Sequence, residues 1–117
     1  MKLATAVAAG LVLASPTQAD DFPTECSASL TALTISGVEA FCKDLRVTSE
    51  GGLLAEKLIQ RGDCEKIAYN QLQLDLERLG ARPNPNTNGM DNTEAWCDYA
   101  QGTLERSLPD SKAVEPR

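Results

Sequence analysis

Apolar residues recur at helical spacing in four stretches of the chain. The longest is 63–80, where one stripe gathers five of them: Ile67, Ala68, Leu72, Leu76 and Leu79. Asp63 can cap the first turn, and Gly80 can adopt the left-handed conformation that closes a helix. We therefore expect a helix here with both ends marked, and we expect the rest of the chain to be organised around it.

Two further helices are predicted before it. Residues 27–45 have near-helical apolar spacing, although a strand over 30–36 competes because threonines and Gly37 weaken the helix propensity. Thr48 or Ser49 can cap the next helix, and Gly62 stops it. Only about one residue connects this helix to the helix at 63–80, so the two should form an antiparallel pair.

The pattern changes after Gly80. Residues 81–90, with two prolines, three asparagines and a glycine, predict a loop. Asp91 and Glu94 then form a D-x-x-E capping box, and Pro109 closes the fourth helix. Its apolar face comprises Trp96, Tyr99, Ala100, Thr103, Leu104 and Leu108. The polar segment 110–117 is expected to be a flexible tail.

Four amphipathic helices with mostly short connections predict an all-α fold. We expect a small disulfide-stapled antiparallel four-helix bundle or an irregular helical relative of one. The chain has no internal repeat. A single helical domain should span 20–117, with a short N-terminal arm and the flexible tail.

Residues 1–19 read as a secretory signal peptide. A single positive charge at Lys2 precedes an apolar run, and Thr17 and Ala19 occupy the small-residue positions before a cleavage point at Asp20. The apolar run is too short to span a membrane. We therefore expect a secreted or periplasmic mature protein of 98 residues; an uncleaved N-terminal anchor is the alternative.

Four cysteines in an exported chain of this size indicate two disulfides. A four-thiolate zinc site is the alternative, but zinc motifs use closely spaced pairs, whereas the gaps here are 16, 22 and 33 residues. In an up-down bundle, the starts of the first and third helices share one end, and the end of the first and the start of the fourth share the other. That order predicts Cys26–Cys64 and Cys42–Cys97 bonds.

Charge limits the partners. Loss of Lys2 leaves 10 basic against 17 acidic residues, a net charge of −7. Nucleic acid and stable membrane association are not expected, because both require concentrated lysine and arginine. The acidity is explained either by solubility or by a basic protein partner.

Catalytic chemistry has little support in this sequence. Histidine is absent, which removes the usual nucleophile pairs and many metal sites. Carboxylate pairs such as Asp75 with Glu77, or Asp98 with Glu94, occur at helical spacing, but such residues are usually a solvated face. We expect neither enzymatic activity nor a cofactor.

The loop that follows Gly80 partly resembles a calcium-binding EF-hand loop. The weak candidate ligands are Asn84, Asn86, Asn88, Asp91 and Glu94. Pro85 and the displacement of the closing glutamate by one position break the pattern, and an ordinary turn between helices explains the same residues. A metal is therefore not expected.

Aromatic residues and helix acids supply the candidate binding residues. Trp96 and Tyr99 flank Cys97, so they either pack around a disulfide or anchor a ligand or partner. The full candidate set is Trp96, Tyr99, Asp75, Glu77 and Asp98. Glu50 and Glu56 would add long-range attraction for a basic partner.

One segment carries a family resemblance. The run from Phe41-Cys42 through Val47-Thr48 into the helix at 53–58 resembles, in outline, periplasmic helical immunity proteins that neutralise type VI amidase toxins. It covers under a quarter of the chain and contains no diagnostic motif. The resemblance implies a helical inhibitor.

These observations favour a binding protein of the inhibitor or toxin-immunity type, whose partner is more basic than itself. The alternative is a carrier of small hydrophobic ligands or a periplasmic stress chaperone. A large enclosed apolar cavity would favour the carrier, whereas an exposed patch over a solid core would favour the binder.

Overall fold

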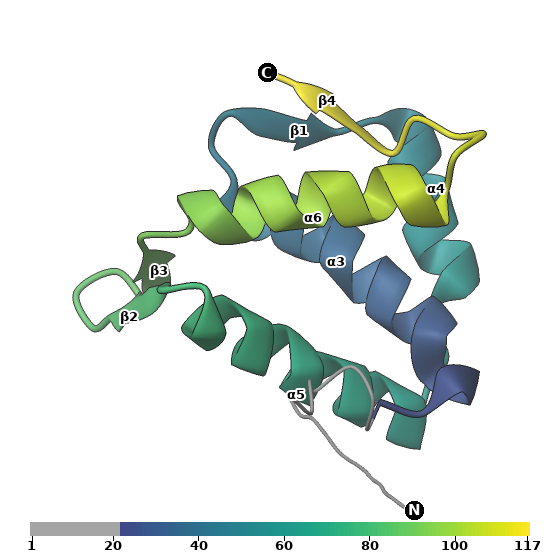
Figure 1. Cartoon of the computed structure of the whole chain (residues 1–117), viewed down its shortest axis with the longest axis horizontal. Coiled ribbons are helices and arrows are strands. Elements are labelled where there is room, and N and C mark those ends of the chain that lie inside the picture. The colour runs from purple at the N-terminus through teal and green to yellow at the C-terminus, as the bar shows by residue number, and fades with distance from the viewer. Residues whose placement is uncertain (1–21) are drawn as a thin grey trace, which may run out of the picture.

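The computed structural model describes residues 22–117, so the predicted signal peptide at 1–19 lies outside the described part of the chain. Its helices and strands are shown in Figure 1. In chain order they are η1 (Thr24–Cys26), α3 (Ser27–Phe41), β1 (Leu45–Val47), α4 (Ser49–Leu58), α5 (Asp63–Arg78), β2 (Arg82–Asn84), β3 (Gly89–Asp91), α6 (Glu94–Ser107) and β4 (Val114–Pro116).

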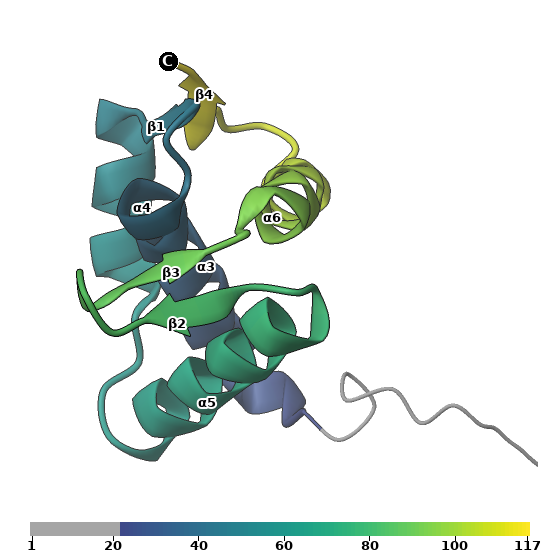
Figure 2. The same cartoon turned by 90° about the vertical axis from the view of Figure 1, so that its left-hand side faces the viewer.

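The prediction of an all-α four-helix bundle is wrong. Residues 22–117 form a small mixed α/β domain, with four α-helices and two small antiparallel sheets. One sheet pairs β1 with β4, and the other pairs β2 with β3. Helices supply most of the core. The β1–β4 sheet lies at the top of the molecule in Figures 1 and 2, and the β2–β3 hairpin lies at the left-hand side of Figure 1.

Helix α3, rather than α5, lies at the centre. It packs against α4, α5 and α6, which surround it in both views (Figures 1 and 2). Gly37 allows α6 to approach α3 closely, because a Cβ added there would lie 2.6 Å from the ring of Trp96. The core joins α3, α5 and α6 through Ile35, Val38, Leu72, Leu76, Trp96, Ala100 and Leu104.

The C-terminal segment is ordered as β4 and does not form the flexible tail that its polar composition predicts. Val47 lies opposite Val114 in an antiparallel pair, and Ala113 and Val114 are buried. The side chain of Arg117 donates to the backbone oxygens of Lys43 and Leu45. Two apolar residues in the segment and this terminal arginine therefore fasten it to β1.

Helix α3 ends at Phe41 and does not continue to Leu45, because Cys42 is extended and the chain turns into β1. Both predicted disulfides are present. Cys26–Cys64 joins η1 to the first turn of α5, and Cys42–Cys97 joins the end of α3 to the first turn of α6. The predicted pairing is correct although the predicted fold class is wrong, because the pairing depends only on which helix ends lie next to the two ends of α3.

Two bonds of this kind are compatible with an oxidising extracellular or periplasmic environment. None of the helices in 22–117 combines the length and the apolar content needed to cross a membrane.

Local helix signals were partly correct. Thr48 caps α4 by accepting from the backbone N–H of Gly51, and Gly80 is left-handed with φ of 96°. The D-x-x-E capping box is wrong, because Asp91 belongs to β3 and the N-cap of α6 is Thr93. The hydroxyl of Thr93 instead donates to the backbone oxygen of Phe41.

Candidate binding groove on helix α5

A groove of about 690 Å³ lies along the outer face of α5, open to solvent. Its floor is the C-terminal half of that helix, and its wall is the β2–β3 hairpin with the turn that leads into it. The residues of this groove, called the α5 groove below, are Asn70, Gln73, Leu74, Glu77, Gly80, Ala81, Arg82, Pro83 and Met90.

The floor is the side of α5 that points away from α3. Helical periodicity turns Ala68, Leu72 and Leu76 toward the core, where all three are buried. The same periodicity turns Leu74 outward, and it remains 44% exposed. An apolar side chain therefore stands on the polar face of an amphipathic helix.

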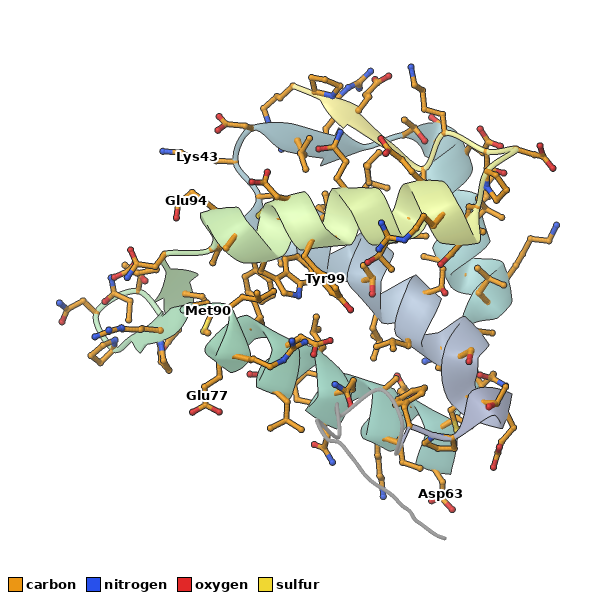
Figure 3. The ribbon with its side chains drawn as sticks, viewed as in Figure 1. Lys43, Asp63, Glu77, Met90, Glu94 and Tyr99 are labelled. Carbon is orange, nitrogen blue, oxygen red and sulfur yellow. A yellow bond between two sulfur atoms is a disulfide. The ribbon has the colours of Figure 1, made fainter. Side chains whose placement is uncertain are left out.

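The wall is positioned by a tight reversal after α5. Gly80 adopts the left-handed conformation, and the backbone N–H of Ala81 donates to the oxygen of Leu76. In the hairpin, Pro83 lies directly opposite Met90, so their side chains share one face, and both line the groove. Figure 3 shows Met90 beside the C-terminal end of α5 and Glu77 projecting from its last turns.

Four polar side chains line the α5 groove: Asn70, Gln73, Glu77 and Arg82. Within 22–117 none of them takes part in a side-chain hydrogen bond or an ion pair. Asn70, Glu77 and Arg82 are exposed, and Gln73 is half-buried. Two carboxamides, a carboxylate and a guanidinium are therefore available beside the apolar surface of Leu74, Pro83 and Met90.

A second groove of about 480 Å³ lies at the other end of α5 and shares Asn70 with the first. Tyr69, which is half-exposed, and Leu33 of α3 supply its apolar surface, while Glu65 and Lys66 are its charged residues. This second groove therefore lies on the flank of α5 that is next to α3.

Of the five predicted binding residues, Glu77 alone lines the α5 groove. Trp96 is only 1% exposed and packs edge-to-face on Phe41, with ring centroids 6.0 Å apart. It is a core residue and cannot anchor a partner at the surface. Asp98 is exposed on α6 and lines none of the grooves described here.

Asp75 is likewise a structural residue, being 5% exposed. Its carboxylate accepts from Gln71 at 3.0 Å and from the guanidinium of Arg78 at 2.6 Å. That hydrogen bond is the main reason why the pKa of Arg78 is raised above its usual value, and the nearby Tyr99 adds a smaller effect. Tyr99 projects from α6 on the side facing α5 (Figure 3), so this polar cluster lies between the two helices.

The calcium candidates serve the hairpin. The amide of Asn84 donates to both carboxylate oxygens of Asp91, and its own oxygen accepts from the backbone N–H of Asn86. Asn88 has φ of 59°, a conformation that asparagine tolerates in turns. Glu94 lies beyond the hairpin, in the first turn of α6. No group of three or more acidic, cysteine or histidine side chains that could hold a metal is found in 22–117.

Sequence reasoning missed Leu74, Pro83 and Met90. A signal for Leu74 was present, because it falls off the apolar stripe of its helix and among polar residues. Nothing local marks Met90, which reaches the groove only because the hairpin folds back beside α5. Ile67, assigned to the buried stripe, is in fact partly exposed.

The chain matches no protein-family model, no curated protein and no solved structure among those compared. The resemblance to immunity proteins therefore gains no support from these comparisons.

Proposed function

We propose that this protein acts by binding a protein partner more basic than itself, and that the α5 groove is the contact surface. The observation that carries the proposal is Leu74, an exposed leucine flanked by Asn70 and Glu77 on the outer face of α5. Exposed apolar surface rimmed by polar groups is typical of protein interaction sites. An inhibitor or toxin-immunity role is one form of this function.

Charge favours a basic partner. A net charge of −7 on residues 20–117 attracts cationic proteins over roughly 8 Å at physiological salt, and it acts chiefly on the association rate. Of the acids that the sequence suggested for this attraction, Glu50, Glu56, Glu77 and Asp98 are exposed, whereas Asp75 is buried against Arg78.

The carrier alternative has less support from the grooves. Sites for small hydrophobic ligands usually enclose most of the ligand surface. Both grooves are open to solvent, so they would leave such a ligand largely in water. Catalysis also has little support, because the chain has no histidine.

The test is affinity capture from periplasm or culture fluid with residues 20–117 as bait. We expect basic proteins on the native bait and their loss on Leu74→Asp. Leu53→Asp is the matched control, because Leu53 is 63% exposed on α4 and lies outside both α5 grooves. The association rate of the captured partner should fall as salt rises. An acidic partner, or association indifferent to salt, would contradict the proposal and move the carrier reading ahead.

A further inference from the structure

We infer that the α5 groove receives an extended peptide segment of the partner, in which a large apolar residue is followed or preceded closely by lysine or arginine. The inference rests on the proposed function and names the element of the partner that docks. It follows from the arrangement of the amides, the apolar strip and the carboxylate in the groove.

The amides point to a peptide backbone. Asn70 and Gln73 each carry a donor and an acceptor, which is the complement of a peptide group. Three residues apart on a helix, their Cβ atoms lie about 5–6 Å from each other. Peptide groups on one side of an extended chain repeat every ~6.6 Å, so the two amides can pair with successive groups of that kind.

The apolar strip accounts for one anchoring side chain. Leu74 forms the floor, and the cross-strand pair of Pro83 and Met90 forms the facing wall. Methionine adapts its shape to varied partners, so the strip can accept leucine, methionine or an aromatic ring. A single large apolar residue of the segment would occupy it.

Glu77 specifies the basic neighbour. It follows Gln73 and Leu74 at helical spacings of four and three, and therefore lies next to both on one face. Its carboxylate has no ion-pair partner within 22–117. A lysine or arginine beside the apolar anchor would supply one, and the net charge of −7 favours the same sign.

Other occupants fit less well. A fatty chain has nothing to pair with Asn70, Gln73, Glu77 and Arg82, so their solvation would be lost without replacement. A second copy of this chain would also carry a net charge of −7, so the two copies would repel each other.

The experiment selects peptides from a displayed library of random ten-residue sequences on immobilised residues 20–117. We expect enriched peptides to combine a large apolar residue with lysine or arginine within two positions. Leu74→Asp and Glu77→Lys should each lower the affinity of a selected peptide at least tenfold. The matched controls Leu53→Asp and Glu56→Lys, both at exposed positions on α4, should change it less than twofold.

Backbone pairing is tested separately. Methylation of the peptide N–H groups next to the anchor should weaken binding at least fivefold, because the peptide would no longer donate to the side-chain oxygens of Asn70 and Gln73. Thermal melting of each variant confirms that it is folded. Absence of enrichment, or enriched peptides indifferent to Leu74→Asp and Glu77→Lys, would overturn the inference, as would self-association of residues 20–117 through this face. Capture of a basic partner that is still abolished by Leu74→Asp would then leave the proposed function standing.

Discussion

Helices α5 and α6 use their apolar side chains differently. Both pack on α3, and both carry a disulfide cysteine in the first turn. Helix α6 turns Trp96, Ala100 and Leu104 into the core, and its only large apolar residue counted as exposed is the amphipathic Tyr99. Helix α5 buries a similar stripe, yet it also exposes three large apolar residues, Ile67, Tyr69 and Leu74.

Under the proposed function, this difference separates side chains that stabilise the fold from side chains that would contact a partner. The apolar side chains of α6 are almost fully used by the fold, which includes the close contact of Trp96 with Gly37. Helix α5 keeps apolar side chains exposed on its outer face, next to the amides of Asn70 and Gln73 and to the β2–β3 hairpin. Its inner face even includes the buried carboxylate of Asp75, so the α5–α6 boundary is partly polar.

Trp96→Ala should produce the largest loss, because it empties a fully buried site beside Gly37 and Phe41. We expect the free energy of unfolding to fall by about 3–5 kcal/mol, measured by urea denaturation. Tyr99→Ala on the same helix is the control, and it should cost clearly less because Tyr99 is 39% exposed. Equal losses would mean that α6 is not divided into a buried and a surface aromatic.

Removing either disulfide by paired Cys→Ser substitution should cost about 2–4 kcal/mol. The two bonds close 55 and 38 residues, a difference worth only about 0.3 kcal/mol in chain entropy. We expect the Cys42–Cys97 removal to cost more, because both of its sulfurs lie in buried residues, whereas Cys64 is half-buried. Chemical denaturation of the two variants decides this. A larger loss at Cys26–Cys64 would make α5 the more firmly fixed helix.

Asp75→Ala should lower the free energy of unfolding by about 1–3 kcal/mol, because Gln71 and Arg78 lose their shared acceptor next to the core. Asp98→Ala is the matched control on α6. Asp98 is exposed, so its loss should stay within about 0.5 kcal/mol. If the two variants unfold at the same denaturant concentration, the Asp75 cluster does not stabilise the α5–α6 boundary.

Leu74→Ala should change the free energy of unfolding by less than about 0.5 kcal/mol while weakening partner binding. Leu72→Ala, two residues earlier and buried, should instead cost about 2–5 kcal/mol. Melting followed by circular dichroism measures both. A large loss for Leu74→Ala would show that this leucine belongs to the fold, and the α5 groove would lose its apolar floor as a recognition element.

The spacing of apolar residues located the four helices to within a few residues. The order of these helices then predicted the disulfide pairing. A helix is held by hydrogen bonds between residues four apart, so the signals that predict it lie within or next to its own segment. Such signals are the apolar stripe, the N-cap Thr48 of α4 and the left-handed Gly80 after α5. The same reasoning could not decide whether Trp96 packs in the core or contacts a partner, and it did not predict that Asp75 is buried. Their side chains are suited to interfaces, and whether they face a partner or the core depends on how α6 and α5 are rotated against α3.

The helical segments, the acidity and the cysteine pairing can be predicted from the residues alone, because each depends on local pattern, composition or helix order. The two sheets and the α5 groove cannot, because they depend on how distant segments fold together. Leu45 pairs with Pro116, although the two residues lie far apart in the sequence. Strands of three residues carry no local signal strong enough to predict so distant a partner. The α5 groove likewise exists because the β2–β3 hairpin folds back beside α5, which brings Met90 into the same groove as Leu74 although nothing in the sequence links the two residues.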